Sequence, residues 1–110
     1  MTKEEKLQAF ADKMKEGFKL VSEKRNEEAI ETLKPFVELM KKSGGEHIRL
    51  YVHYSLAQIR TGDFKGFLET YEAVKTMKAK TEEEERLKEQ LDGFFTELME
   101  QLGNASGQSE

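Results

Sequence analysis

Apolar residues recur every three or four positions through most of this chain, and that spacing limits the fold more than any other feature. The first stripe consists of Leu7, Phe10, Met14, Phe18 and Val21. Residues spaced in this way share one face of an α-helix, so the stripe predicts an amphipathic helix over 3–23. Good helix formers fill the long segments, and the chain has a single proline. The pattern therefore predicts an all-α fold.

Two further helices are delimited by turn residues. The second begins after Asn26, the expected N-cap, and ends at the two glycines at 44–45, and Pro35 is expected to kink or interrupt it. The third helix, over 46–61, is apolar almost all round. That composition is typical of a helix packed between neighbours on several sides. We expect the third helix to form the centre of the fold.

Capping residues mark the fourth and fifth helices. Gly62-Asp63 ends the third helix and caps the fourth, while Thr81 with Glu84 forms a capping box for the fifth. Gly103 is expected to end the fifth helix. We therefore expect one helical domain over 1–103 and a disordered polar tail over 104–110.

The apolar pattern repeats after 38 residues. This offset aligns a helix, a turn and a second helix without a gap, and a further offset of 39 places the fifth helix under the first stripe. A period of about 20–50 residues is typical of stacked helical hairpins, in which each unit buries its apolar face against the next. The aligned pairs include Phe10 with Ile48, Met14 with Val52, Phe18 with Leu56, Val21 with Ile59, Leu33 with Tyr71 and Phe36 with Val74.

The residues around the turn of each unit carry a family signature: Leu56-Ala57, Gly62-Asp63-Phe64 and Tyr71 in the second, and Asn26-Glu27-Glu28-Ala29-Ile30 in the first. They resemble the tetratricopeptide repeat over roughly 10–80, although Lys24 stands where the family's turn has glycine. The resemblance implies a right-handed superhelix of two antiparallel helical hairpins followed by a C-terminal capping helix. It also implies a concave groove that binds peptides.

Two registers are open for that groove. In one, the apolar stripes face the groove, which would suit an amphipathic helix or an apolar peptide. In the other, the stripes are buried between helices and the groove is basic. We favour the basic register, because burying a regular apolar stripe is the main drive to fold. The apolar register would expose Met14, Phe18, Val21, Val52, Leu56 and Ile59, and the basic register Lys15, Lys19, His53, Ala57 and Arg60.

Charge and composition argue against several classes of function. The net charge of −4 disfavours nucleic acid, whose binding depends on a basic face. The chain has no cysteine, so we expect no thiolate metal site. It has no apolar run of membrane-spanning length, so we expect a cytoplasmic protein that does not insert into a membrane. His47 and His53 fall on different helix faces and make a poor metal pair. No catalytic motif is present, so we expect neither an enzyme nor a cofactor.

These expectations favour a non-catalytic protein–protein interaction module, similar to an adaptor or a co-chaperone. It would bind a peptide segment of a partner in the groove, and a basic groove would suit an acidic tail. The alternative is a structural subunit that associates with itself, or a secretion-type chaperone, through apolar helix faces. Phe94, Phe95 and Met99 widen the apolar face of the fifth helix beyond one stripe, which favours such an interface.

Overall fold

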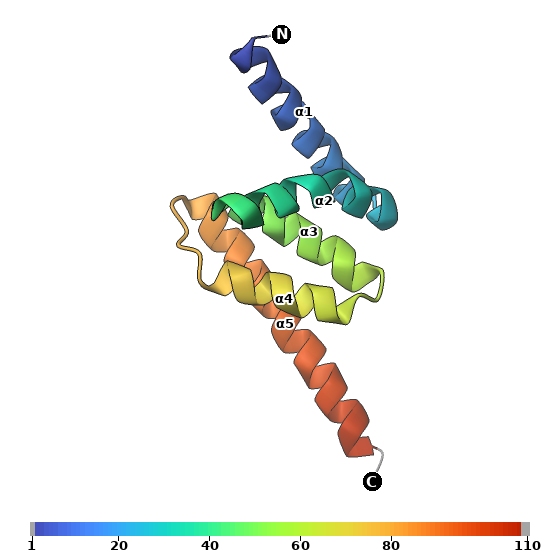
Figure 1. The fold of residues 1–110 in the computed structure, drawn as a ribbon. Helices are drawn as coiled ribbons and strands as arrows, with labels where there is room; N and C mark the ends of the chain where they lie inside the picture. The colour runs from blue at the N-terminus through green and yellow to red at the C-terminus, as the bar shows by residue number, and fades with distance from the viewer. Residues whose placement is uncertain (1, 109–110) are drawn as a thin grey trace.

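The chain folds into five α-helices, so the all-α prediction is confirmed. A computed structural model describes the backbone of residues 2–108 and contains no strand within that range. The helices follow one another through short turns (Figure 1). Their bounds are α1 Lys3–Ser22, α2 Asn26–Ser43, α3 Ile48–Arg60, α4 Phe64–Lys75 and α5 Glu82–Gln108.

Helix α3 forms the centre of the fold, as predicted. It packs against each of the other four helices, while α1 makes no contact with α5 and α2 makes none with α4 within the described residues. Such an enclosed helix has to be apolar on nearly every side. Its buried apolar residues are Ile48, Leu50, Tyr51, Val52, Tyr54, Leu56 and Ala57.

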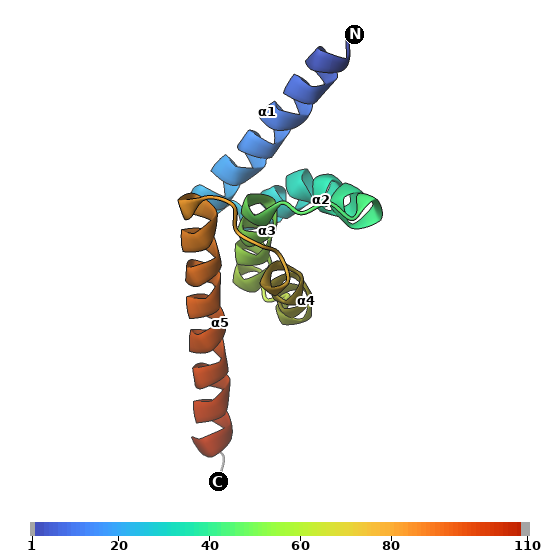
Figure 2. The same ribbon diagram turned by 90° about the vertical axis from the view of Figure 1, so that its left-hand side faces the viewer.

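The two outer helices extend well beyond this centre. Figures 1 and 2 show the N-terminal half of α1 and the C-terminal half of α5 projecting from the α2–α3–α4 body in opposite directions. They give the molecule extents of 62 × 28 × 24 Å. Phe10 of α1 still contacts Phe36 of α2, and Leu98 of α5 still packs against the core, but Leu7 and Leu102 beyond them are exposed.

The two hairpins, α1–α2 and α3–α4, turn in the same way. Lys24 and Gly62, which are 38 residues apart, both adopt left-handed backbone, with φ of 62° and 86°. The N–H of Arg25 donates to the carbonyl of Leu20 at 2.9 Å, and the N–H of Asp63 donates to that of Gln58 at the same distance. The offset found in the sequence thus relates two turns with the same backbone geometry.

A glycine in α1 allows the two helices of the first hairpin to approach closely. A Cβ atom added at Gly17 would lie only 2.6 Å from Cγ of Leu33, a fully buried side chain of α2. Only glycine therefore fits at this crossing. Position 55, the equivalent in α3, holds a buried serine whose hydroxyl donates to the carbonyl of Val52 at 2.7 Å.

The caps predicted for α4 and α5 are present, and His47 caps α3 in addition. Nδ1 of His47 accepts from the N–H of Leu50 at 3.1 Å, and a carboxylate oxygen of Asp63 accepts from the N–H of Gly66 at 2.9 Å. The hydroxyl of Thr81 accepts from the N–H of the residue three positions later. These side chains satisfy N–H groups that the first helical turn leaves without a partner.

The expectations for Asn26 and Gly103 as helix limits are wrong, and the interruption allowed for at Pro35 does not occur. Asn26 does not cap α2, because it lies inside the helix and its amide donates to the carbonyl of Lys24 at 3.2 Å. Pro35 does not interrupt α2, which runs through it to Ser43. Gly103 does not end α5, which continues to Gln108, so the predicted tail begins too early. A lone glycine costs a helix about 1 kcal/mol and does not by itself stop one. Positions 109–110 of that tail lie outside the described residues.

Helix α5 is attached to α4 by an aromatic and a polar contact. The ring of Tyr71 stacks on Phe95 with centroids 4.2 Å apart, and its hydroxyl donates to Asp92 at 2.8 Å. The pKa of the Tyr71 hydroxyl is raised to about 12, mainly by its burial and to a smaller extent by the neighbouring Asp92 carboxylate. The N-terminal half of α5 is therefore fixed to the body, whereas its C-terminal half is not.

Candidate functional site

The five residues predicted to line a basic groove do not form one site. Ala57 is completely buried, so it cannot touch a ligand and that prediction is wrong. Lys15 and His53 each lie beside Phe18, as described below. Lys19 is exposed on α1. Arg60 lies at the C-terminal end of α3, where its guanidinium contacts the end of α1.

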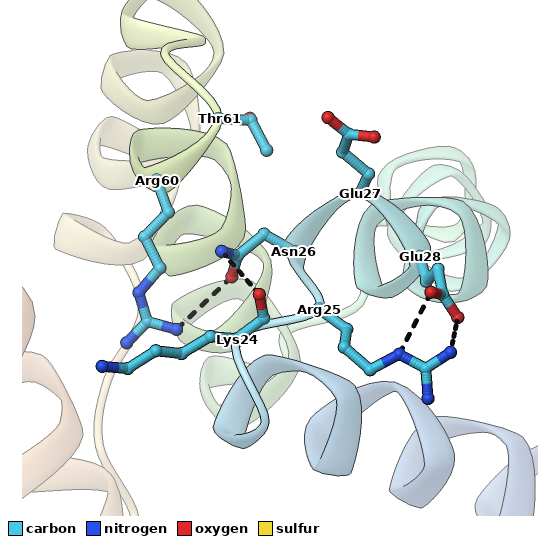
Figure 3. Close-up of a pocket in the computed structure, with 7 residues that line it drawn as sticks. All are labelled: Lys24, Arg25, Asn26, Glu27, Glu28, Arg60 and Thr61. Atoms are coloured by element: carbon cyan, nitrogen blue, oxygen red, sulfur yellow. Dashed lines mark hydrogen bonds and ion pairs between the residues drawn. The ribbon is translucent and has the colours of Figure 1, made fainter.

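Arg60 connects the C-terminus of α3 to that of α1. Its guanidinium donates to the carbonyl of Val21 at 2.9 Å. It also donates to the side-chain oxygen of Asn26 at 3.4 Å (Figure 3). A cation at the end of a helix binds its free carbonyls and the negative end of its dipole. This contact accounts for an arginine at position 60 without a ligand.

The surface around Arg60 is a polar pocket of about 470 Å³. Its three cations and two carboxylates nearly cancel, and one pair is in contact, since Arg25 donates to both carboxylate oxygens of Glu28, at 3.1 and 2.6 Å (Figure 3). The lining residues are Lys24, Arg25, Asn26, Glu27, Glu28, Arg60 and Thr61. A pocket so balanced in charge has little preference for an anionic or a cationic ligand.

A second pocket, of about 490 Å³, lies beside Phe18 between α1 and the start of α3. Its floor is apolar, and two exposed cations, Lys15 and Arg49, stand at its edge. We call it the Phe18 groove. Its lining residues are Ala11, Met14, Lys15, Phe18, His47 and Arg49.

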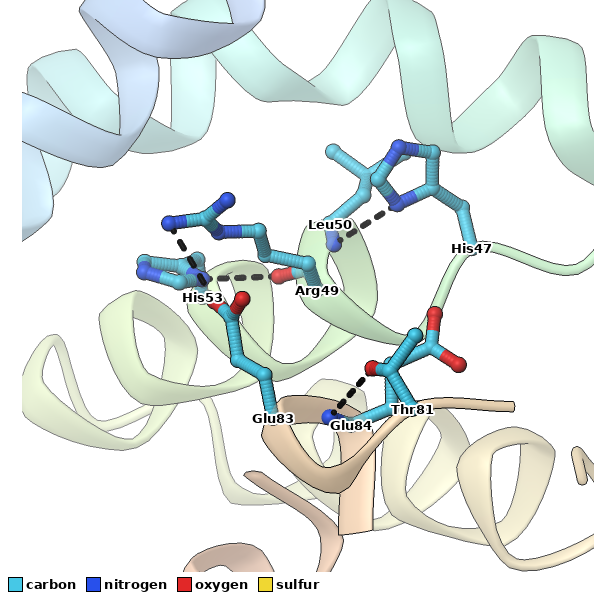
Figure 4. A network of polar contacts seen from close by, with 7 residues as sticks. All are labelled: His47, Arg49, Leu50, His53, Thr81, Glu83 and Glu84. Atoms are coloured by element: carbon cyan, nitrogen blue, oxygen red, sulfur yellow. Dashed lines mark hydrogen bonds and ion pairs between the residues drawn. The ribbon is translucent and has the colours of Figure 1, made fainter. Parts of the chain in front are cut away.

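The side chains of His53 and Arg49 hold Phe18 in place. Its ring lies 4.4 Å from that of His53, centroid to centroid, and the guanidinium carbon of Arg49 lies 5.6 Å from its centroid. Arg49 also forms an ion pair with Glu83 of α5 at 3.3 Å (Figure 4). A guanidinium has five N–H donors, so this single ion pair leaves Arg49 able to bind another carboxylate.

Both histidines near the groove are neutral at pH 7. Burial lowers the pKa of His53 below its ordinary value of 6.5, against the opposing effect of a hydrogen bond to the carbonyl of Arg49. That oxygen can only accept, so Nδ1 of His53 carries the proton. Burial likewise lowers the pKa of His47, whose Nδ1 accepts a hydrogen bond (Figure 4). The positive charge of the groove therefore comes from Lys15 and Arg49 alone.

The observed surface combines the two predicted registers. Val21, Val52 and Leu56 are buried, so the apolar register is wrong for them. Met14 and Phe18 remain half-exposed and form the groove floor, which the basic register did not include. Sequence reasoning also missed Arg49, although it lies one helical turn before His53 and therefore on the same face of α3.

An apolar cleft of about 590 Å³ lies on the opposite side of α1, where this helix diverges from α2. Phe10 meets Phe36 there edge to face, with centroids 5.9 Å apart. Its lining residues are Ala9, Phe10, Lys13, Glu31, Thr32, Pro35 and Phe36. The cleft shows that Pro35, a position without an N–H donor, lies on an uncovered face of α2.

Metal-ligand and membrane-spanning features were also sought in the described part of the chain. No three His, Cys, Asp or Glu side chains come together there in a way that could hold a metal ion. None of the described helices combines the length and the hydropathy needed to cross a bilayer.

Comparison of the chain with protein-family models, with curated proteins and with solved structures finds no match.

Proposed function

We propose that this chain is a non-catalytic protein-interaction module whose Phe18 groove binds an acidic amphipathic segment of a partner protein. The observation that carries the proposal is a half-exposed aromatic floor with two cations at its edge. Apolar side chains of the segment would cover Met14 and Phe18. Its carboxylates would meet Lys15 and Arg49 as charge-assisted hydrogen bonds.

The arrangement of helices supports a tetratricopeptide-like module. The first helices of the two hairpins, α1 and α3, lie in contact, and α5 contacts α3 in turn. The two hairpins also share one turn geometry. In such an array the first helices line the binding surface, and the Phe18 groove lies between α1 and α3.

A designed peptide tests this proposal. The probe is a helical peptide of about 16 residues, with leucine at i, i+4, i+7 and i+11 and glutamate on the flanking positions. We expect it to bind the wild-type chain in fluorescence anisotropy. The same peptide with lysine in place of glutamate should bind about tenfold or more weakly, because it would face the groove cations. Equal binding of the two peptides would contradict a basic edge.

Variants locate the site. Lys15→Glu with Arg49→Glu should weaken binding of the glutamate peptide about tenfold or more, since two attractive contacts become repulsive. The matched control, Lys34→Glu with Lys65→Glu, makes the same change in net charge at exposed positions on α2 and α4. Phe18→Ala should weaken both peptides. If the control weakens binding as much as the groove variant, the effect comes from net charge, and the groove is not the site.

A further inference from the structure

The apolar stripe of α5 packs against the core as far as Leu98, and beyond that residue nothing covers it among the described residues. Leu91, in the first half of the helix, is completely buried against the body. Leu102 lies on the same face, three turns later, and is 51% exposed, and Met99 beside it is also exposed. The same stripe therefore changes from core to surface where the body ends.

The opposite end of the molecule has a matching stripe. Leu7, Ala11, Met14 and Phe18 follow one face of α1 at i, i+4, i+7 and i+11. Leu7 is 58% exposed, and this stripe continues the floor of the Phe18 groove toward the N-terminus. On α5 the same spacing is formed by Leu91, Phe95, Leu98 and Leu102. Each stripe spans about 17 Å along its helix at 1.5 Å per residue.

The charges beside the two stripes are opposite. From Leu91 to Leu102 the chain has Asp92, Glu97 and Glu100 and no basic residue. Along α1, Lys6, Lys15 and Lys19 lie beside the stripe, whereas Asp12 and Glu16 lie toward the far side of the helix, where Glu16 pairs with Lys13 at 3.2 Å. The projecting half of α5 is thus an acidic amphipathic helix, which is the class of ligand proposed for the Phe18 groove.

We propose that the C-terminal half of α5 from one copy of the chain packs along the Leu7–Phe18 stripe of a second copy. This inference rests on the proposed function, because it names a partner for the Phe18 groove. Apolar side chains at Leu98 and Leu102 cover Leu7 and Met14, and the acidic flank of α5 faces the lysines of α1. In one chain the two stripes project in opposite directions (Figures 1 and 2), so the contact forms between molecules.

The contact is heterologous, because two different surfaces meet. The pair then keeps one free α1 stripe, on the first copy, and one free α5 stripe, on the second, so association continues into an open chain or closes into a ring. Pairing of α1 with α1, or of α5 with α5, would instead stop at a symmetric dimer. Like charges beside like stripes disfavour both symmetric arrangements.

Two single variants test the inference by sedimentation velocity over a range of concentrations. Leu7→Glu blocks the α1 stripe and Leu102→Glu blocks the α5 stripe. Both positions are more than half exposed, so circular dichroism should show the folded state unchanged. We expect the wild-type chain to associate, and each variant alone to associate about tenfold or more weakly, because a carboxylate would be buried against apolar side chains. Leu39→Glu, at a 48% exposed leucine of α2, is the matched control and should associate like the wild type.

The mixture of the two variants distinguishes the arrangements. Leu7→Glu retains an intact α5 stripe and Leu102→Glu an intact α1 stripe, so together they should form a 1:1 dimer. A monomeric wild type, a single variant that associates fully, or a mixture that stays monomeric would each overturn the inference.

The glutamate peptide separates failure of this inference from failure of the proposed function. It should bind the Leu102→Glu variant, whose groove is intact. If the peptide binds but the chains do not associate, the groove has a different partner and only the self-association is wrong. If neither occurs, both proposals fail.

Discussion

The hairpins α1–α2 and α3–α4 turn alike but are covered differently. Phe10 of α1 and Ile48 of α3 occupy equivalent positions, 38 residues apart, yet Phe10 is 49% exposed and Ile48 only 3%. The reason is their neighbours. Helix α3 contacts all four of the other helices, while among the described residues α1 contacts only α2 and α3. The same local pattern is therefore core in one hairpin and exposed surface in the other.

The largest expected effect comes from truncating this equivalent pair. Ile48→Ala should lower the free energy of unfolding by about 2–4 kcal/mol, because it leaves a cavity in the core. Phe10→Ala removes more atoms but should cost only about 1 kcal/mol, since half of the ring is already in water. Urea denaturation of both variants measures the difference. A larger loss for Phe10→Ala would mean that α1 is covered in solution, for example by a second copy.

The next effect concerns the close crossing of α1 and α2. Gly17→Ala should destabilise the fold by about 1–3 kcal/mol, because its Cβ would overlap the buried side chain of Leu33. Gly93→Ala is the control, since nothing lies within 4 Å of a Cβ at that position of α5. It should stabilise by about 0.5–1 kcal/mol through helix propensity alone. Thermal melts of the two variants should therefore shift in opposite directions, and a shared direction would refute the close crossing.

A smaller effect should follow from exchanging the two turns. Lys24 adopts left-handed backbone, which is strained for lysine, and Arg25 caps α2 without a side-chain hydrogen bond. The combined change Lys24→Gly and Arg25→Asp copies Gly62-Asp63 into the first hairpin. It should stabilise by about 1 kcal/mol, through relief of strain and a new N-cap. The reverse exchange at Gly62 and Asp63 should destabilise by a similar amount in urea denaturation. If both exchanges were neutral, the two turns would not be equivalent.

Much of the fold could be predicted from the sequence, because periodicity reports which residues share a helix face. The five helices, the central place of α3 and the caps at Asp63 and Thr81 all depend on local pattern, and all are present. The end of α5 could not be predicted from Gly103. A single glycine is a weak signal when good helix formers precede it and no neighbour competes for its backbone.

The candidate site was less predictable, because exposure depends on which helix covers which face. Ala57 and Phe18 illustrate this limit. Ala57 was expected in the groove but is enclosed by neighbouring helices, whereas Phe18 was expected in the core but lies at an edge that no helix covers within the described residues. Arg60 lies on the predicted face of α3, yet its guanidinium is engaged by the end of α1. Periodicity contains no information about these partners.

The smallest expected effect is a pH dependence at the N-cap of α3. Nδ1 of His47 accepts the N–H of Leu50 only while the ring is neutral, and burial lowers its pKa below 6.5. Because the folded-state pKa is the lower one, the unfolded chain binds the proton more readily, and stability should fall as the pH drops from 7 through that folded-state pKa. The variant His47→Asn retains a capping oxygen that does not titrate in this range, so its stability should fall less over the same interval. Urea denaturation of both proteins at pH 7 and pH 5.5 measures the difference, and parallel losses would show that the His47 cap contributes nothing to it.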